Sequence, residues 1–137
     1  MLAFFPPPEA GDIVYCRFPL KGIPGPSPKP RPALVLQVGE VNGEPYVAVA
    51  YGTSQKTDRL HAGEFLIGPA DGEAYALSGL SFPTKFDLRS VKELPYSEEW
   101  FRVPPHAPYG QTPRLGVLHP ALMRRARSAF NAARRKS

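Results

Sequence analysis

The stretch Lys29-Pro30-Arg31-Pro32-Ala33-Leu34-Val35-Leu36 joins a charged, proline-rich segment to an apolar run. Each proline fixes its own φ at about −65° and pushes the residue before it, Lys29 or Arg31, toward extended geometry. The short, β-branched run over 33–38 then predicts a buried strand. We therefore expect Arg31 at the mouth of a strand, where its guanidinium presents a fork that suits a phosphate group.

A polar cluster follows the next predicted strand. Asn42-Gly43 is a strong hairpin signal, and residues 46–51 alternate as a strand should. Gly52-Thr53-Ser54-Gln55-Lys56 comes directly after them. Such side chains at a strand end either face a ligand or cap a turn, and the residue types alone favour the turn.

The rest of the body also consists of short apolar segments. Strands are expected over 13–18 and 64–67, with 75–80 pairing to the latter or beginning another segment. Residues 80–88 predict a strand that Pro83 interrupts, hence an edge or a bulge, and 90–95 continue it weakly. The chain's 18 prolines and 12 glycines disfavour long helices. Five or six short strands predict a mainly β fold, a small, strongly bent barrel.

One domain with a flexible arm is the expected organisation. Residues 1–10 predict that arm, 11–95 the barrel, and 96–137 a proline-rich wrap and a C-terminal helix within the same domain. In the wrap, Trp100 is expected as a packing anchor, with an interface residue as the alternative. The helix begins at Pro120, and its apolar face comprises Leu122, Ala126, Ala129, Phe130 and Ala133.

Charge is distributed unevenly along the chain. Residues 1–99 hold nine Lys and Arg against 12 Asp and Glu, whereas 100–137 hold eight Lys and Arg and no acid. The basic segment favours an anionic partner, nucleic acid or an acidic protein, although a solvated helix face fits as well. There is no apolar run long enough for a membrane span and no secretory signal, so we expect a cytoplasmic protein. A lone Cys16 excludes an intramolecular disulfide.

The candidate chemistry is that of a phosphodiester. His61, His106 and His119 are scattered, so no metal site is predicted, and the sequence has neither a nucleophile elbow nor a glycine-rich phosphate loop. What remains is a set of cations and hydroxyls at predicted strand ends: Arg31, Thr53, Ser54, Lys56, Lys85 and Arg89. Catalysis on a phosphodiester relies on charge stabilisation and on positioning the attacking oxygen, which such a set can supply.

Three segments resemble the MazF/PemK-type toxins of bacterial toxin–antitoxin modules: Gly11-Asp12-Ile13-Val14, the stretch 29–36, and Tyr51-Gly52-Thr53-Ser54-Gln55-Lys56. The resemblance covers residues 11–95. It implies a strongly bent SH3-like β-barrel of the MazF/PemK/CcdB type, a homodimer and a cognate antitoxin protein as partner. It also implies cleavage of single-stranded RNA without a metal or cofactor, in which the ribose 2′-hydroxyl attacks the adjacent phosphate.

The same resemblance suggests roles for individual residues. Arg31 would stabilise the transition state, and Thr53 would orient the scissile phosphate. RNA would be held by Lys29, Ser54, Gln55, Lys56, Lys85 and Arg89. Several family members carry an acidic residue in the loop before the arginine, but residues 21–30 contain none. The general base is therefore unassigned: either it comes from elsewhere, with His61 and Glu64 as candidates, or Arg31 serves alone.

Two other functions stay open. The same barrel could be a catalytically silent module that binds RNA or a protein, which the missing loop acid favours. A related toxin branch with this fold poisons a DNA topoisomerase, although the basic C-terminal helix gives that reading little support. The pairing of Arg31 with Thr53 favours the nuclease.

Overall fold

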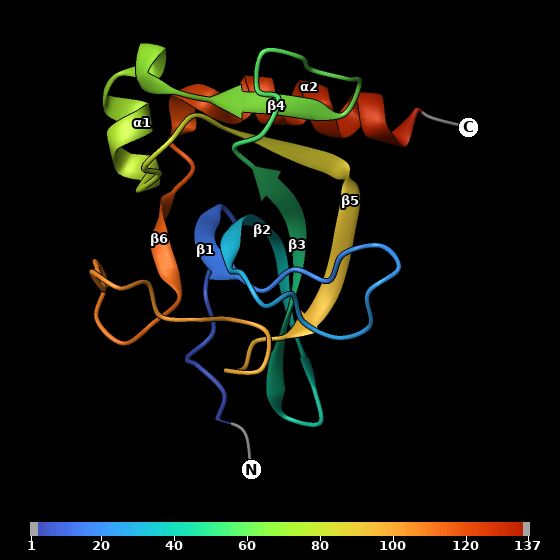
Figure 1. Ribbon diagram of the computed structural model, residues 1–137, viewed down its shortest axis with the longest axis vertical. Helices are drawn as coiled ribbons and strands as arrows, with labels where there is room; N and C mark the ends of the chain where they lie inside the picture. The colour runs from blue at the N-terminus through green and yellow to red at the C-terminus, as the bar shows by residue number, and fades with distance from the viewer. Residues whose placement is uncertain (1–2, 136–137) are drawn as a thin grey trace.

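The computed structural model describes residues 3–135, which form one antiparallel sheet and a few short helices. Within these residues the elements are β1 (Asp12–Cys16), β2 (Arg31–Val41), β3 (Glu44–Thr53), β4 (Glu64–Ile67), the 3₁₀ turn η1 (Pro69–Asp71), α1 (Glu73–Ser78), β5 (Thr84–Pro95), β6 (Arg114–Val117), the 3₁₀ turn η2 (Pro120–Leu122) and α2 (Met123–Arg134). The order across the sheet is β4-β5-β3-β2-β1-β6. The predicted mainly β fold with a C-terminal helix is confirmed (Figure 1).

Helix α1 lies between the two edge strands of the bent sheet. It follows β4 along the chain and packs against β6 (Figure 1). The approach is close, because a Cβ atom at Gly116 would collide with the backbone carbonyls of Leu77 and Ser78. The sheet is thus bridged by a helix where β4 and β6 do not pair with each other.

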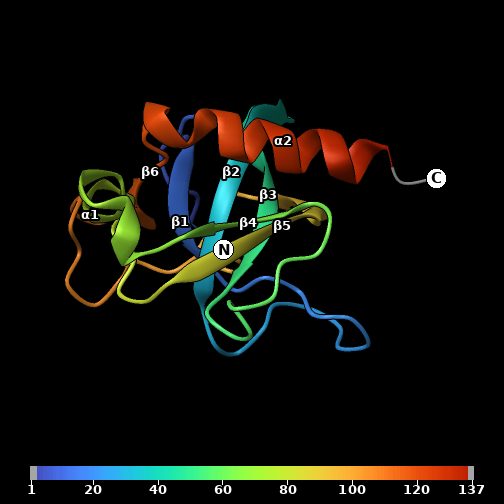
Figure 2. The ribbon, with the colours of Figure 1, turned by 90° about the horizontal axis from the view of Figure 1, so that it is seen from above.

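Both faces of the sheet are covered. On one face, Ile13, Leu34 and Phe86 pack in a cluster that also holds Leu122 and Ala129 of the C-terminal segment. Helix α2 crosses this face beside β4 and β5 (Figures 1 and 2). On the other face the cluster comprises Val14, Cys16, Phe18, Ala33, Val35, Val47, Val49, Leu94, Tyr96 and Phe101. Burial on two faces explains why β1 and β2 read as nearly continuous apolar runs rather than alternating ones.

The helix prediction for the C-terminus is confirmed, with a short 3₁₀ turn at its start. Pro120 begins η2, and α2 follows from Met123. Leu122 and Ala129 are buried, whereas Phe130 is 40% exposed at the margin of the apolar face. Among residues 3–135, the structure contains no helix long and apolar enough to cross a membrane.

Two predictions for the middle of the chain are wrong. Residues 75–80 do not form a strand, because 73–78 fold as α1 between Gly72 and a left-handed Gly79. The strand expected over 80–88, with Pro83 as the sign of an edge or a bulge, is β5; it begins after Pro83 and is not an edge but an interior strand between β4 and β3. Its bulge lies between Asp87 and Val91, where the register against β3 shifts.

The irregular wrap contains a strand that the sequence reading missed. β6 pairs with β1 through Val117 opposite Asp12 and Gly116 opposite Ile13. Trp100 packs against the second cluster, as predicted.

The first described residues lie against this wrap. Phe5 donates its backbone N–H to Tyr96, and Glu98 donates to Ala3. The division into an arm, a barrel and a tail stays a prediction.

Candidate active site

The β2–β3 hairpin brings Arg31 and Thr53 together. Asn42 and Gly43 form its turn, with φ values of 54° and 81°. Near the turn Val41 pairs with Glu44, but the register shifts by one residue at Leu36, so that Ala33 pairs with Tyr51. The same register, continued two residues to the strand ends, sets Arg31 opposite Thr53.

A close approach of the strands tightens this end of the hairpin. A Cβ atom at Gly52 would meet the carbonyl oxygen of Pro32 and would lie 2.8 Å from the ring of Phe86. Only glycine leaves room for both neighbours at this position. Gly52 therefore lets the backbone carrying Thr53 lie directly beside the backbone carrying Arg31.

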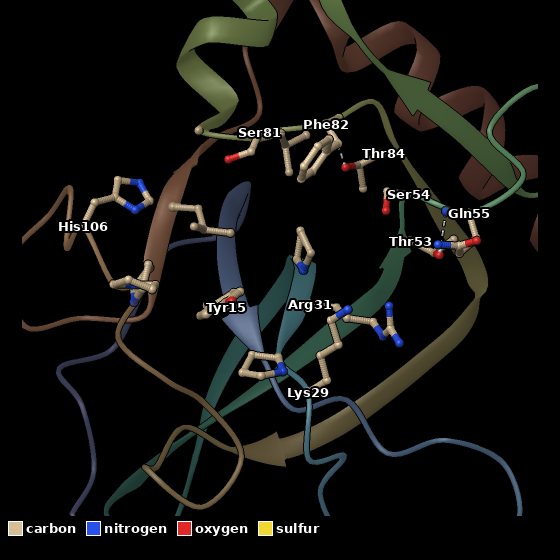
Figure 3. A pocket seen from close by; sticks show the side chains of 17 residues that line it. Tyr15, Lys29, Arg31, Thr53, Ser54, Gln55, Ser81, Phe82, Thr84 and His106 are labelled. Atoms are coloured by element: carbon tan, nitrogen blue, oxygen red, sulfur yellow. Dashed lines mark hydrogen bonds between the residues drawn. The ribbon is translucent and has the colours of Figure 1, made fainter.

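A pocket of about 390 Å³ opens at these strand ends. Figure 3 shows Arg31, Lys29 and Thr53 on one side of it, with His106 on the other and Phe82 at the rim. The polar lining consists of two cations, five hydroxyls, an amide and an imidazole: Lys29, Arg31, Tyr15, Thr53, Ser54, Ser81, Thr84, Gln55 and His106. No carboxylate is among the described residues that line it. The lining is suited to an anion.

The guanidinium of Arg31 has no protein partner in residues 3–135. Its Nε atom is buried and makes no hydrogen bond, and no carboxylate forms an ion pair with it there. A buried donor without an acceptor costs free energy, so an acceptor supplied by a ligand would be favourable. Arg31 is thus prepared for an anionic group.

Thr53 is held by a local turn. Its hydroxyl oxygen accepts a hydrogen bond from the backbone N–H of Gln55 at 3.1 Å (Figure 3). Because the oxygen serves as the acceptor there, its own O–H stays available to donate to a ligand. The cluster after β3 therefore does both things that the sequence left open: it forms a turn and it lines a pocket.

The remaining predicted RNA-binding residues divide into two groups. Lys29, Ser54 and Gln55 line the pocket, whereas Lys56 lies in the turn after β3 and does not. Lys85 is only 7% exposed. Its ammonium group donates to the carbonyl of Arg59 at 2.8 Å and pairs with Glu64 at 3.3 Å. Lys85 is consequently occupied within the fold rather than directed into the pocket.

Arg89 is also engaged elsewhere. Its guanidinium pairs with Asp87 at 3.1 Å and with Glu64 at 4.0 Å. The hydrogen bond to Asp87 raises the pKa of this guanidinium, so it stays charged. We leave Arg89 and Lys85 out of the proposed site.

Both sequence candidates for a general base lie outside the pocket. His61 and Glu64 line a separate groove between the segment before β4 and helix α2. The carboxylate of Glu64 already accepts from Lys85 and from the backbone N–H of His61. The basic residues Arg124 and Arg125 of α2 border the same separate groove, and Arg125 pairs with Asp71 at 3.0 Å.

Several residues that line the pocket were not among the candidates from the sequence. Tyr15 comes from β1, Ser81 and Phe82 from the segment after α1, and His106 from the segment before β6. Each lies far along the chain from Arg31, so only the sheet order brings it there. One signal in the sequence could have found two of these residues. In Phe82-Pro83 and Pro105-His106 an aromatic or imidazole side chain stands beside a proline in a loop, where binding residues often lie.

The described residues contain no cluster of three or more histidine, cysteine or carboxylate side chains that could hold a metal ion.

The loop before β2 contributes only its end to the pocket. Lys29 and Pro30 line it, whereas Arg17 closes the base of the loop by donating from Nε to the carbonyl of Ser27 at 2.8 Å.

Comparison with known proteins places these observations in a family. The PemK-like, MazF-like toxins of type II toxin–antitoxin systems match residues 9–132 of the chain. The fold is similar to that of an endoribonuclease from a mycobacterial species, with a TM-score of 0.57 and 16% sequence identity over 96% of this chain and 94% of the other. It is also similar to a mycobacterial endoribonuclease in complex with its cognate antitoxin, with a TM-score of 0.55 and 17% identity over 95% of this chain and 97% of the other. A search of curated proteins found no match.

Proposed function

The chain belongs to the PemK-like, MazF-like toxins of type II toxin–antitoxin systems, and from this premise we propose that it is an endoribonuclease that cleaves single-stranded RNA without a metal ion. The observation that carries the proposal is the guanidinium of Arg31, which has no partner within residues 3–135, in one pocket with the hydroxyl of Thr53. The endoribonuclease activity of two proteins with the same fold supports it.

In the proposed reaction the ribose 2′-hydroxyl attacks the adjacent phosphorus. A new bond forms between O2′ and phosphorus, and the bond from phosphorus to O5′ breaks. The products are a 2′,3′-cyclic phosphate and a free 5′-hydroxyl. Negative charge grows on the phosphoryl oxygens in the transition state, where the forked N–H groups of Arg31 stabilise it. The hydroxyl of Thr53 donates to one of these oxygens and fixes the phosphate in line for attack.

A proton must leave O2′ and another must reach O5′. His106 is the one histidine among the described residues that line the pocket, and an imidazole can accept a proton from a reacting hydroxyl. We assign proton transfer with O2′ to His106 and donation to O5′ to Arg31 or to solvent. If His106→Gln retains the wild-type dependence of kcat on pH, this assignment is wrong.

The proposed partners are single-stranded RNA and a cognate antitoxin protein. A mycobacterial protein of the same fold forms a complex with its own antitoxin. Formation of a homodimer stays a prediction.

The test is cleavage of an unstructured RNA oligonucleotide in EDTA. Arg31→Ala should lower kcat/KM by about 100- to 1,000-fold, the effect typical of removing one transition-state donor, and Thr53→Ala should lower it as well. Lys92→Ala is the matched control, because it removes one exposed cation on β5, outside the pocket. Intact RNA with the unaltered protein would contradict the proposal, and cleavage by Arg31→Ala at the wild-type rate would contradict the site.

A catalytically silent RNA-binding module is the second candidate. The absence of a carboxylate from the described lining of the pocket favours it. This candidate predicts RNA binding that depends on Arg31 and is accompanied by no cleavage. Gel separation of the RNA after binding distinguishes the two functions.

A further inference from the structure

Phe82 is an exposed aromatic side chain at the rim of the Arg31 pocket. At 67% exposure it exceeds every other exposed large apolar residue in the described chain. The chain is buried two residues away on either side: Leu80 is 8% exposed and Thr84 is 2% exposed. The ring therefore stands in solvent on a segment whose two sides are anchored in the core.

The backbone on both sides of Phe82 is fixed. Gly79 ends α1 with a φ of 70°, and a side chain there would collide with the backbone of Leu115 in β6. On the other side, Pro83 confines Phe82 to extended geometry. The hydroxyl of Thr84 donates to the carbonyl of Phe82 at 2.9 Å (Figure 3). These constraints fix the backbone that carries the ring, so that less conformational entropy is lost when a ligand binds to it.

The surroundings of the ring indicate what would cover it. Phe82 lines the same pocket as Arg31 and Lys29, whose charges suit a phosphate, and the exposed hydroxyl of Ser81 lies next to it in the chain. A planar apolar face, a hydroxyl and a phosphate site together match a nucleotide, because bases of single-stranded RNA stack on aromatic rings.

We propose that Phe82 is the stacking platform for a nucleobase adjacent to the cleaved phosphate. This inference rests on the proposed function for the identity of the phosphate. Ser81 is placed to donate to or accept from the edge of that base. Stacking on a ring tolerates any base, so Phe82 supplies affinity and register, whereas hydrogen bonds from Ser81 would supply any preference among bases.

Kinetics of two substitutions test the platform. Phe82→Ala should raise KM for a single-stranded RNA oligonucleotide by roughly 5- to 150-fold, the range for losing one base–aromatic stack. The value of kcat should change little, because stacking is made equally in the ground state and in the transition state. Phe82→Trp keeps a stacking ring and should restore KM. Phe4→Ala is the matched control, since it removes another exposed phenyl ring (36% exposed) that does not line the pocket.

Binding of oligonucleotides with single abasic positions locates the stacked base. The probe is a 2′-O-methyl RNA, which the 2′-hydroxyl mechanism cannot cleave, and its Kd is measured by fluorescence anisotropy. For the stacked position, removing the base and replacing Phe82 by alanine should each weaken binding. The two changes together should weaken it no further than either alone. Additive effects at every abasic position would overturn the proposal.

The outcomes separate this proposal from the proposed function. If the wild-type protein cleaves RNA and Phe82→Ala has unchanged KM, the platform is wrong and the nuclease stands. If the wild-type protein does not cleave but the anisotropy cycle shows coupling to Phe82, the nuclease is wrong and the platform stands. If Phe82→Ala changes the oligomeric state of the protein in solution and leaves RNA binding unchanged, the ring makes a contact between protein chains, and the platform is wrong.

Discussion

The buried Nε atom of Arg31 predicts a conflict between stability and activity. A buried N–H group without an acceptor costs about 1–3 kcal/mol, and the Nε of Arg31 is such a group in the described structure. Arg31→Met keeps an unbranched stem of similar reach and removes the N–H. We expect the lower end of that range, because Arg31 is only half-buried and the rest of its guanidinium reaches water. Arg31→Met should therefore raise the free energy of unfolding by about 1 kcal/mol.

This change is large enough to measure. The entropy of unfolding is about 2.1 cal/mol/K per residue near 60 °C, which for a chain of 137 residues makes 1 kcal/mol equivalent to about 3–4 °C in Tm. Urea unfolding followed by the fluorescence of Trp100 gives the same quantity, since that side chain packs against the second cluster. Protein concentration must be held constant in case the chain self-associates.

Lys29→Met is the control for this experiment. Lys29 is an exposed cation of the same pocket, so its replacement should leave the free energy of unfolding within about 0.5 kcal/mol of the wild-type value. Arg31→Met should be more stable than the wild type and nearly inactive on RNA. If Arg31→Met is less stable than the wild type by 1 kcal/mol or more, the Nε atom is hydrogen-bonded in solution, and Arg31 is not held ready for an anion.

Three further predictions concern the support of the site and of the fold. Gly52→Ala should lower RNA cleavage at least tenfold because the new Cβ meets the carbonyl of Pro32; retention of full kcat/KM would show that the hairpin end adapts freely. The hydrogen bond from Arg125 holds the pKa of the Asp71 carboxyl below its usual range. The ion pair therefore stabilises the fold at pH values above the unfolded-state pKa of Asp71. This stabilisation is lost as the pH falls through the lower pKa that Asp71 has in the folded protein. Asp71→Asn should accordingly be less stable than the wild type by under about 1 kcal/mol at pH 7, and urea titrations should show the two proteins converging in acid. Burial raises the pKa of the Cys16 thiol well above its ordinary range, so a thiol reagent should label it only in denaturant; rapid labelling of the native protein would contradict its buried position.

The sequence identifies the hairpin because its signals are local. Asn42 and Gly43 both adopt the positive φ that this dipeptide tolerates, and prolines beside Arg31 lead into a strand as expected. Which residue of β3 lies opposite Arg31 depends on a one-residue bulge in β2. Near the turn, Val41 pairs with Glu44. If that register continued without the shift at Leu36, Arg31 would lie opposite Ser54 instead of Thr53. A bulge of one residue has no clear signature in a single sequence.

Lys85 shows the limit of reasoning from residue type. A lysine beside a predicted strand end is a reasonable RNA ligand, yet the pairing of β4 with β5 places it against Glu64. That partner lies 21 residues away in the chain. The pairing of strands decides which cations are neutralised within the fold, and the sequence alone does not reveal it.

Helix α1 and strand β6 were missed because neither has a recognisable pattern. α1 has six residues, too few for a helical period to be recognised, and β6 has four residues that include Arg114 and Gly116 and lack the continuous apolar run of the equally short β4. Their omission matters for the site, since the segment after α1 supplies Phe82 and the one before β6 supplies His106. About half of the pocket therefore comes from parts of the chain whose structure the sequence pattern did not predict.

The most direct test of the central claim uses one altered ribose. Once the cleaved bond in an RNA oligonucleotide is mapped, the nucleotide on its 5′ side is replaced by its 2′-deoxy form, and the reaction is run in EDTA. This single change should abolish cleavage at that bond, while the unmodified RNA should yield a 2′,3′-cyclic phosphate and a 5′-hydroxyl. Cleavage of the deoxy-substituted bond at the rate of the unmodified RNA would show that the 2′-hydroxyl is not the nucleophile and would contradict the proposed roles of Arg31 and Thr53.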